Sequence, residues 1–210
     1  EKQMHTLQNY TVWMSDFLIE LDLGPYCLAG NSLGGAIASN IAFEYPYLVE
    51  ACIPISSAAY LNEGENPFYQ EILSGKNLFF VENKADYQEF LRRVFHKQMK
   101  EIPLISSTLQ TEMIESRFWL LKLMEDMKTF MIGVDDHWSP KNFMNEQLQN
   151  TEVQFHFIWG RYDSLFPVQT LDVLSNINPL VRTYVVEDCG HCPHLERPVK
   201  LAQYFKQIMG

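Results

Sequence analysis

The sequence holds a serine among glycines, Gly30-Asn31-Ser32-Leu33-Gly34, where an apolar run gives way to a helical pattern. A sharp strand-to-helix turn forces the serine backbone into a strained conformation, so the flanking positions must lack bulky side chains. Gly30 and Gly34 are expected to meet this requirement. The turn lifts the Ser32 hydroxyl clear of the sheet and aims a helix N-terminus at it. No lysine follows the glycines, as a phosphate-binding P-loop requires. Ser32 is therefore a candidate nucleophile.

A serine hydroxyl reacts well only when a base removes its proton, so a histidine oriented by a carboxylate should follow. His191 lies in the run Gly190-His191-Cys192-Pro193-His194, directly after the last predicted strand, and Asp163 lies just past the strand before it. Because the carboxyl ends of parallel strands meet at one edge of a sheet, both side chains are expected beside Ser32. The predicted nucleophile, acid and base are Ser32, Asp163 and His191.

Neighbouring residues offer rival assignments. Asp172 falls inside a predicted helix and Asp188 lies at the base of the histidine loop, so Asp163 is preferred as the acid; His194 is the alternative base. The run from Cys189 to His194 also has the C-x-x-C and H-x-x-H spacings of zinc ligands. Four ligands in so short a run rarely converge tetrahedrally, and we expect neither a metal nor a cofactor.

Hydrophobic patterning predicts the elements that position these residues. Short apolar runs alternate with amphipathic segments, which is typical of a mostly parallel α/β sheet with helices on both faces. The first strand, 26–29, is expected to be buried on both faces. The other predicted elements are helices at 7–21, 33–45, around 168–176 and at the C-terminus, and strands at 51–56, 153–159 and 182–187.

Between the two α/β parts lies a region without convincing strand alternation. We predict three segments: 1–57, the first part of the core with the nucleophile; 58–150, a helical cap; and 151–210, the second part of the core with the acid and base. Two apolar stripes in the cap fit either ordinary helix cores or an adaptable wall for a lipid-like ligand. They are Tyr87, Phe90, Leu91, Val94 and Phe95, and Leu120, Leu123, Met124, Met127 and Met131, with Trp119 and Phe130 beside the second.

Composition limits the function classes. The 210 residues, 47% of them hydrophobic and 20% charged, are sufficient for one soluble globular domain with a core. A net charge of −10 argues against nucleic acid as a partner. The uncharged stretch 24–43 is long enough to cross a bilayer, but its proline and glycines favour a buried strand, turn and helix. The four cysteines are expected to be unpaired thiols.

Three motifs in order, G-N-S-L-G-G, W-G-R-Y-D-S-L-F-P and G-H-C-P-H-L-E-R-P, with a helical cap between the first two, resemble the α/β-hydrolase family over nearly the whole chain. The resemblance implies the α/β-hydrolase fold with Ser32 as nucleophile, Asp163 as acid and His191 as base. It also makes the Leu33 N–H one donor of the oxyanion hole.

The resemblance also implies the activity of a serine hydrolase. The cap is similar to those of monoacylglycerol-lipase-like hydrolases, which favours a carboxylesterase or lipase that cleaves small-molecule esters or lipids with apolar acyl chains through an acyl-serine intermediate. The alternatives are a carbon–carbon bond hydrolase, since those relatives also carry G-N-S-x-G-G, and a receptor that binds a small ligand in the triad pocket.

One family feature is missing from the sequence. The His-Gly motif that usually marks the second oxyanion donor should precede the nucleophile, but only 31 residues stand before Ser32. We expect the first strands of the sheet to be missing and the sequence to be a portion of a longer protein. A cytoplasmic location is favoured, with a signal or membrane anchor lost from view as the alternative. Peripheral membrane contact through the cap is a further expectation, and the oligomeric state is left open.

Overall fold

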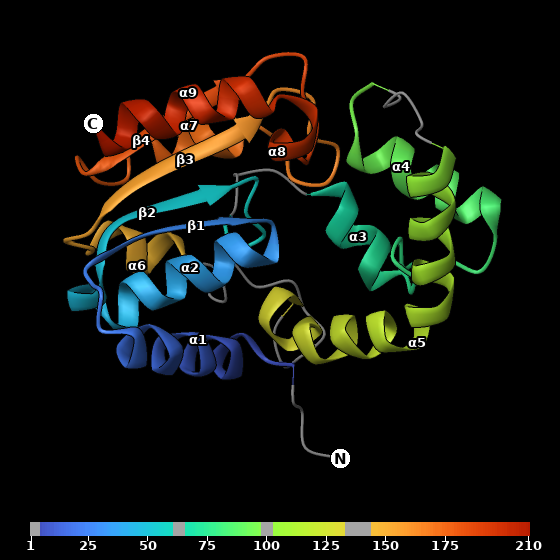
Figure 1. Cartoon of the computed structure of the whole chain (residues 1–210), viewed down its shortest axis with the longest axis horizontal. Coiled ribbons are helices and arrows are strands. Elements are labelled where there is room, and N and C mark those ends of the chain that lie inside the picture. The colour runs from blue at the N-terminus through green and yellow to red at the C-terminus, as the bar shows by residue number, and fades with distance from the viewer. Residues whose placement is uncertain (1–4, 61–65, 98–102, 133–143) are drawn as a thin grey trace.

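A parallel sheet lies at the centre of the computed structural model, which describes residues 5–60, 66–97, 103–132 and 144–210. Its four strands run in the order β1-β2-β3-β4 (Figure 1). β2 and β3 are neighbours although the predicted cap separates them in the sequence. Each predicted strand is confirmed to within two residues at either end; the observed bounds are β1 Tyr26–Asn31, β2 Val49–Ile55, β3 Gln154–Gly160 and β4 Val181–Val186.

Helices form two groups around the sheet. One group packs on or beside the strands: α1 (Leu7–Leu21), α2 (Leu33–Glu44), the 3-10 helix η1 (Pro46–Leu48), α6 (Asn145–Gln149), α7 (Thr170–Leu174), α8 (Pro193–Glu196) and α9 (Pro198–Met209). The other group forms a lobe beyond the carboxyl ends of the strands (Figure 1): α3 (Pro67–Leu73), α4 (Lys84–Val94) and α5 (Pro103–Ile132).

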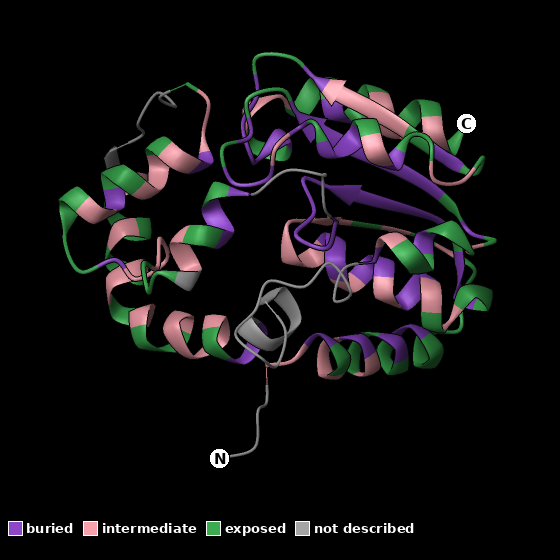
Figure 2. Ribbon diagram, turned by 180° about the vertical axis from the view of Figure 1, so that it is seen from behind, coloured by how far each residue is buried: buried purple, intermediate pink, exposed green. Residues whose placement is uncertain are grey.

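The sheet is covered on both faces, as alternation along β3 demonstrates. Phe155 and Phe157 belong to the larger core, which includes α2, α6 and α7, whereas Ile158 belongs to a smaller core with Leu201 of α9. Successive strand residues point to opposite faces, so one strand supplies both cores. Figure 2 shows the resulting buried band along the two central strands, β2 and β3. The predicted helical layers on both faces are confirmed.

The expectation that β1 is buried on both faces is wrong for one face. Cys27 and Ala29 are exposed. Ala29 is in register with Ile53, which faces the α9 side of the sheet, and α9 itself packs on β4 at the opposite edge. Among the described residues no strand pairs with the outer edge of β1. An apolar strand composition therefore did not distinguish a covered face from an open one.

Helix α1 has the predicted bounds, and its buried face is partly polar. Thr6 caps its N-terminus, accepting a hydrogen bond from Asn9 N at 3.1 Å. The buried residues are Leu7, Thr11, Ser15 and Leu18, while Met14, Phe17 and Leu21 are exposed. Asn40 of α2 donates to the Thr11 hydroxyl at 3.0 Å. The buried face of α1 therefore combines Leu7 and Leu18 with two small polar residues, whereas Met14, Phe17 and Leu21 point away from the core.

The predicted cap range, 58–150, includes a helix that packs on the sheet. Leu148 of α6 is fully buried in the larger core, and Met144 N donates to Ala59 O at 3.0 Å. The lobe proper is therefore α3 to α5. None of the helices in the described ranges combines the length and apolar character that a membrane span needs.

Candidate active site

Ser32 occupies the predicted turn between β1 and α2. Its backbone has φ 55° and ψ −118°, a conformation that L-residues with a side chain rarely adopt. The Ser32 N–H donates to Ile55 O at 2.9 Å, which anchors the turn to β2. A Cβ on Gly30 would lie 2.2 Å from the carbonyl carbon and oxygen of Gly34. Position 30 therefore has room only for glycine, as predicted.

The second sterically required glycine is Gly35 rather than Gly34. Open space surrounds the Cβ position of Gly34 among the described residues, whereas a Cβ on Gly35 would lie 2.9 Å from both Gly30 O and Ser57 Cβ. The first turn of α2 thus presses on the segment after β2 through its third residue. The prediction that the turn needs a glycine at position 34 is wrong. The spacing of glycines around the serine did not reveal the contact between Gly35 and Ser57.

The backbone N–H of Leu33 is available at the nucleophile. Ser32 O accepts hydrogen bonds from Gly35 N at 3.0 Å and Ala36 N at 3.3 Å, which starts α2. Within the described part of the chain, Leu33 N–H has no acceptor. A free N–H at the start of a helix is suited to a developing oxyanion. This agrees with the predicted role of Leu33, which stays a prediction.

Asp163 and His191 form a buried pair. The imidazole Nδ1 lies 2.9 Å from Asp163 Oδ2, and the two residues are 5% and 8% exposed, respectively. The other carboxylate oxygen, Oδ1, accepts hydrogen bonds from Leu165 N at 2.9 Å and Phe166 N at 3.0 Å. These two donors fix the carboxylate, and the carboxylate in turn fixes the tautomer and orientation of the ring.

The rival acids and the rival base lie elsewhere. Asp172 is exposed on α7, and Asp188 pairs with Lys97 at 3.1 Å. His194 is exposed on α8, but neighbouring atoms cover part of its ring, and this desolvation together with the nearby His191 holds its pKa below the usual value. Of the candidates, the structure brings Asp163 alone to the imidazole.

Asn31 joins the nucleophile turn to the base. Its side-chain Nδ2 donates to His191 O at 3.0 Å and to Ile55 O at 3.1 Å. The Ser32 hydroxyl has no hydrogen bond to the imidazole among the described residues, an arrangement common in substrate-free hydrolases, in which this contact tightens on binding. Asn31 was not among the predicted site residues, although its place beside the serine was a signal.

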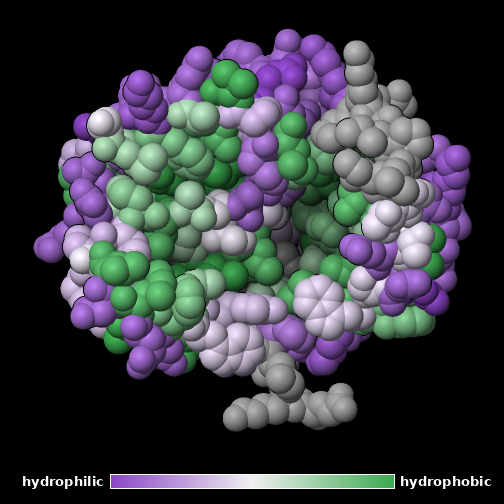
Figure 3. All heavy atoms as spheres, in the orientation of Figure 1, coloured by the Kyte–Doolittle hydropathy of each residue, from purple (hydrophilic) through white to green (hydrophobic). Residues whose placement is uncertain are grey.

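Ser32 opens into an apolar cavity of about 170 Å³ between the sheet and the cap lobe. In the space-filling view the molecule is hollowed there, with hydrophobic residues inside the hollow and hydrophilic ones along part of its rim (Figure 3). Four residues of the α5 stripe line it, which agrees with the second of the two interpretations of that stripe, a wall for a ligand. Trp119 is exposed and does not line the cavity, and the Phe130 and Met131 side chains lie outside the described residues. The lining residues are Ser32, Leu33, Ala58, Phe68, Phe79, Leu120, Leu123, Met124, Met127, Leu165 and Phe166.

The ring of Phe166 connects the cavity with the acid and base. It is tilted against the His191 imidazole with centroids 5.3 Å apart, and it also lines the cavity that holds Ser32. The other predicted stripe is different, since Tyr87 and Val94 of α4 are buried against neighbouring elements and do not line the cavity. That stripe is an ordinary helix core.

The two cysteines beside His191 are buried. All four cysteines are free, which confirms the expectation of unpaired thiols. Burial, with Glu196 nearby, raises the pKa of Cys192 to about 12 and also raises that of Cys189. Among the described residues no three His, Cys, Asp or Glu side chains gather as a metal site would require.

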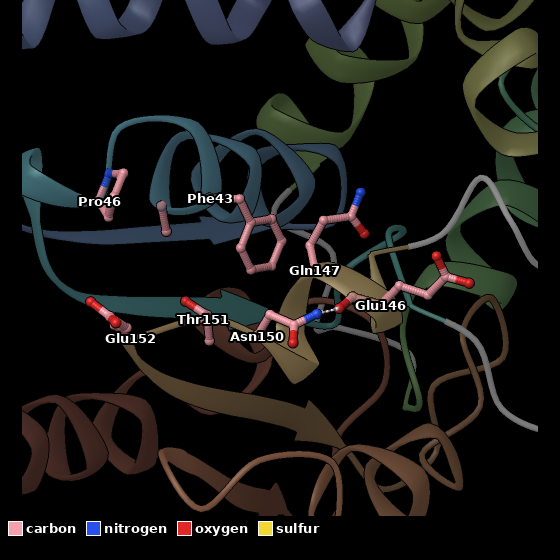
Figure 4. A pocket seen from close by; sticks show the side chains of 8 residues that line it. Phe43, Pro46, Glu146, Gln147, Asn150, Thr151 and Glu152 are labelled. Atoms are coloured by element: carbon pink, nitrogen blue, oxygen red, sulfur yellow. Dashed lines mark hydrogen bonds between the residues drawn. The ribbon is translucent and has the colours of Figure 1, made fainter.

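A larger and more open cavity, about 570 Å³, lies at the other end of the strands. Its lining includes Phe43 of α2 and polar residues around α6, among them Glu146, Asn150 and Glu152 (Figure 4). The Asn150 side chain is occupied by a hydrogen bond to Glu146 O. The described lining residues provide carboxylates, amides and the Thr151 hydroxyl, which accepts a hydrogen bond from Val153 N at 3.1 Å, and they include no histidine.

The site combines a serine at a strained strand–helix turn with a histidine–carboxylate pair at the same ends of a parallel sheet. This combination is typical of α/β proteins that use a serine nucleophile. The chain belongs to the alpha/beta hydrolase fold family, whose model matches residues 3–198.

Relatives and solved structures agree with this assignment. The chain is 26% identical to monoacylglycerol lipase ABHD6 of Mus musculus (91% of this chain, 57% of the relative) and 22% identical to lipase 1 of Psychrobacter immobilis (85% and 54%). It thus spans little more than half the length of these curated relatives. The crystal structure of a membrane phospholipase A, a bacterial virulence factor, superposes with a TM-score of 0.87 at 21% identity, covering 100% of this chain and 65% of that one.

Proposed function

We propose that this protein hydrolyses carboxylic esters with apolar acyl chains through an acyl intermediate on Ser32. The observation that carries the proposal is a nucleophile that opens into an apolar cavity whose wall, Phe166, contacts the base held by Asp163. Lipases and esterases among the relatives support the same reaction class.

The proposed reaction has two steps. In the first, His191 Nε2 takes the proton of the Ser32 hydroxyl as its oxygen attacks the ester carbonyl, and the Leu33 N–H stabilises the oxyanion. The protonated imidazole then gives its proton to the departing alcohol, which leaves the acyl-serine. In the second, His191 deprotonates a water that attacks the acyl carbon, which releases the acid and restores the serine. Asp163 stays ionised throughout and holds the ring.

The cavity lining favours an uncharged hydrocarbon group. No charged side chain is found among the described residues that line it, and Phe, Leu and Met side chains dominate. An anionic ring-cleavage product, the substrate type of the carbon–carbon hydrolases, would bury its charge there without a partner. The intact Asp163–His191 pair favours an enzyme over a receptor.

Labelling with a fluorophosphonate probe, followed by peptide mapping, tests the nucleophile directly. We expect the label on Ser32 in the complete protein and its loss in Ser32→Ala, together with loss of p-nitrophenyl ester turnover. Ser175→Ala, which removes an exposed hydroxyl at the end of α7, is the matched control and should label and turn over normally. Equal ester turnover by wild type and Ser32→Ala contradicts the proposal.

Peripheral membrane contact through the cap is a second part of the proposal. Helix α5 exposes Leu109, Phe118 and Trp119 at 47%, 62% and 50%. The Arg117 guanidinium lies over the Phe118 ring, 4.6 Å from its centroid. Aromatic residues flanked by a cation suit a lipid interface. Co-sedimentation with anionic lipid vesicles should be reduced in a Phe118→Ser/Trp119→Ser double variant; equal sedimentation of both proteins would rule out this surface.

A further inference from the structure

One carboxylate ties the cap lobe to the loop that carries the base. Glu196 Oε1 accepts a hydrogen bond from Gly190 N at 2.8 Å, and Glu196 Oε2 accepts one from His96 N, just past α4, at 2.9 Å. The His191 N–H itself donates to Val94 O at 2.9 Å. We call residues 94–97 the cap segment and residues 187–192 the base loop.

The two backbones touch without intervening side chains. A Cβ on Gly190 would lie 2.7 Å from His96 N and 2.8 Å from Val94 O, and both of these are main-chain atoms that cannot swing aside. The cap segment is also held to the loop that carries the acid, because the His96 ring stacks on Tyr162 with centroids 3.9 Å apart and planes 10° apart.

His191 is thereby held from three directions. The cap segment accepts its N–H, Asn31 of the nucleophile turn donates to its carbonyl, and Asp163 binds its ring. The remaining contact of the triad, between the imidazole and the Ser32 hydroxyl, is not made in this structure. The position of the cap segment therefore helps to set the distance across which the proton must move.

We propose that Glu196 is a positioning residue that couples the cap to the base. By holding Gly190 and His96 on its two oxygens, it keeps the base loop against the cap segment, so the cap aligns His191 as well as forming the wall of the acyl cavity. The inference rests on the proposed function for its catalytic consequence. Its structural part, the joining of cap and base loop, can be measured without turnover.

Three substitutions in the complete protein test the coupling from two sides. Glu196→Ala removes both acceptors, Glu196→Gln keeps the shape but presents an NH₂ group to one of the two N–H donors, and Gly190→Ala forces the backbones apart. Glu89→Gln is the matched control, since this carboxylate lies on the exposed side of α4 and pairs with Arg92.

We expect kcat per active site to fall about 10- to 100-fold in Glu196→Ala and Gly190→Ala, with KM changed less than about threefold, because a misplacement near 1 Å costs this much. Glu196→Gln should fall between these variants and wild type. Counting active sites with a fluorophosphonate separates alignment from loss of folded protein, which would lower the number of sites and leave kcat per site unchanged.

Hydrogen exchange of the Gly190 and His191 amides gives the turnover-independent result. Exchange should be at least about tenfold faster in Glu196→Ala than in wild type or Glu89→Gln, with β3 amides unaffected. If the wild type cleaves no ester yet the substitution speeds this exchange, the proposed function fails and the coupling stands. Unchanged exchange and unchanged kcat per site in both Glu196 variants overturn the coupling.

Discussion

The two oxygens of Asp163 have separate tasks, which makes an amide substitution informative. In Asp163→Asn the amide oxygen can still accept from Leu165 N and Phe166 N, so the loop should keep its shape. The NH₂ group then faces His191 Nδ1 and forces the proton onto Nε2, where the ring cannot accept the serine proton. We expect kcat for an ester to fall by about 10³- to 10⁴-fold, measured beside the thermal midpoint. A variant that retains a tenth of wild-type kcat would show that Asp163 does not orient the base.

Two glycines that look equivalent in the motif should differ strongly in how far an added methyl group changes the free energy of unfolding. Gly30→Ala pushes a Cβ into the Gly34 carbonyl, so the turn cannot close, and we expect a loss of more than about 3 kcal/mol in the free energy of unfolding. Gly34→Ala meets nothing among the described residues and should change the free energy of unfolding by less than about 1 kcal/mol. Urea unfolding of both variants checks the contrast, and equal losses would contradict it.

Local sequence pattern was sufficient to predict the residues whose chemical type gives them their role. It failed to predict the residues whose role depends on a contact with a distant segment of the chain. Ser32, Asp163 and His191 follow predicted strands, so their meeting at one edge could be expected before any coordinates. Gly35, Asn31 and Glu196 matter because of segments far away in the chain, such as Ser57, His191 and His96. No periodicity reports such contacts.

At the scale of elements, the pair of strands β3 and β4 contains a pH-sensitive group. Burial, and secondarily the charge of Arg182, lowers the pKa of His156, whose Nδ1 lies 3.2 Å from the Tyr184 hydroxyl. Below the ordinary histidine pKa near 6.5 the unfolded chain binds a proton that folded His156 resists, so stability is lost as the pH falls. Between about pH 7.5 and 5.5, His156→Gln should lose less unfolding free energy than wild type. Parallel losses in urea titrations would argue against this role.

Helix α5 should set the acyl length that the cavity accepts. Met124→Trp adds bulk inside the cavity, so we expect kcat/KM for octanoyl esters to fall at least about tenfold while that for acetyl esters changes less than about threefold. Met113→Trp is the control, because Met113 is on the same helix and does not line the cavity. If both esters were affected equally, the cavity would not be the acyl site.

The bounds of helices and strands could be predicted from the sequence better than which of their faces are buried. The bounds of β1 and α1 followed from apolar runs and spacing, yet Cys27 and Phe17 turned out to be exposed. Which face of an element is covered depends on the neighbours that pack on it, and α9 at the far edge of the sheet leaves one face of β1 open. The apolar stripe of α5 fitted either a helix core or a ligand wall, and only the cavity beside Ser32 distinguishes the two.

At the scale of the whole molecule, the cavity lies between the α/β core and the cap lobe. An alkyl chain attached covalently to Ser32 should contact both. Leu165 and Phe166 belong to the core half, whereas Phe68 and Met124 belong to the cap lobe, and all four line the same space. An alkyl group attached to Ser32 would therefore bury its methylenes against both halves. Each fully buried methylene contributes about 0.8 kcal/mol, and for a chain of this size 1 kcal/mol shifts the thermal midpoint by about 2–4 °C.

We accordingly expect the octyl fluorophosphonate adduct to melt about 5 °C or more above the ethyl adduct of the same protein. The difference should shrink in Met124→Trp, in which the cavity is filled, and persist in Met113→Trp. Ser32→Ala, which cannot form an adduct, should show no shift with either reagent and so excludes binding elsewhere. Equal midpoints for the two wild-type adducts would mean that the chain does not enter the space between core and cap, since burial of the longer chain there must stabilise the folded state.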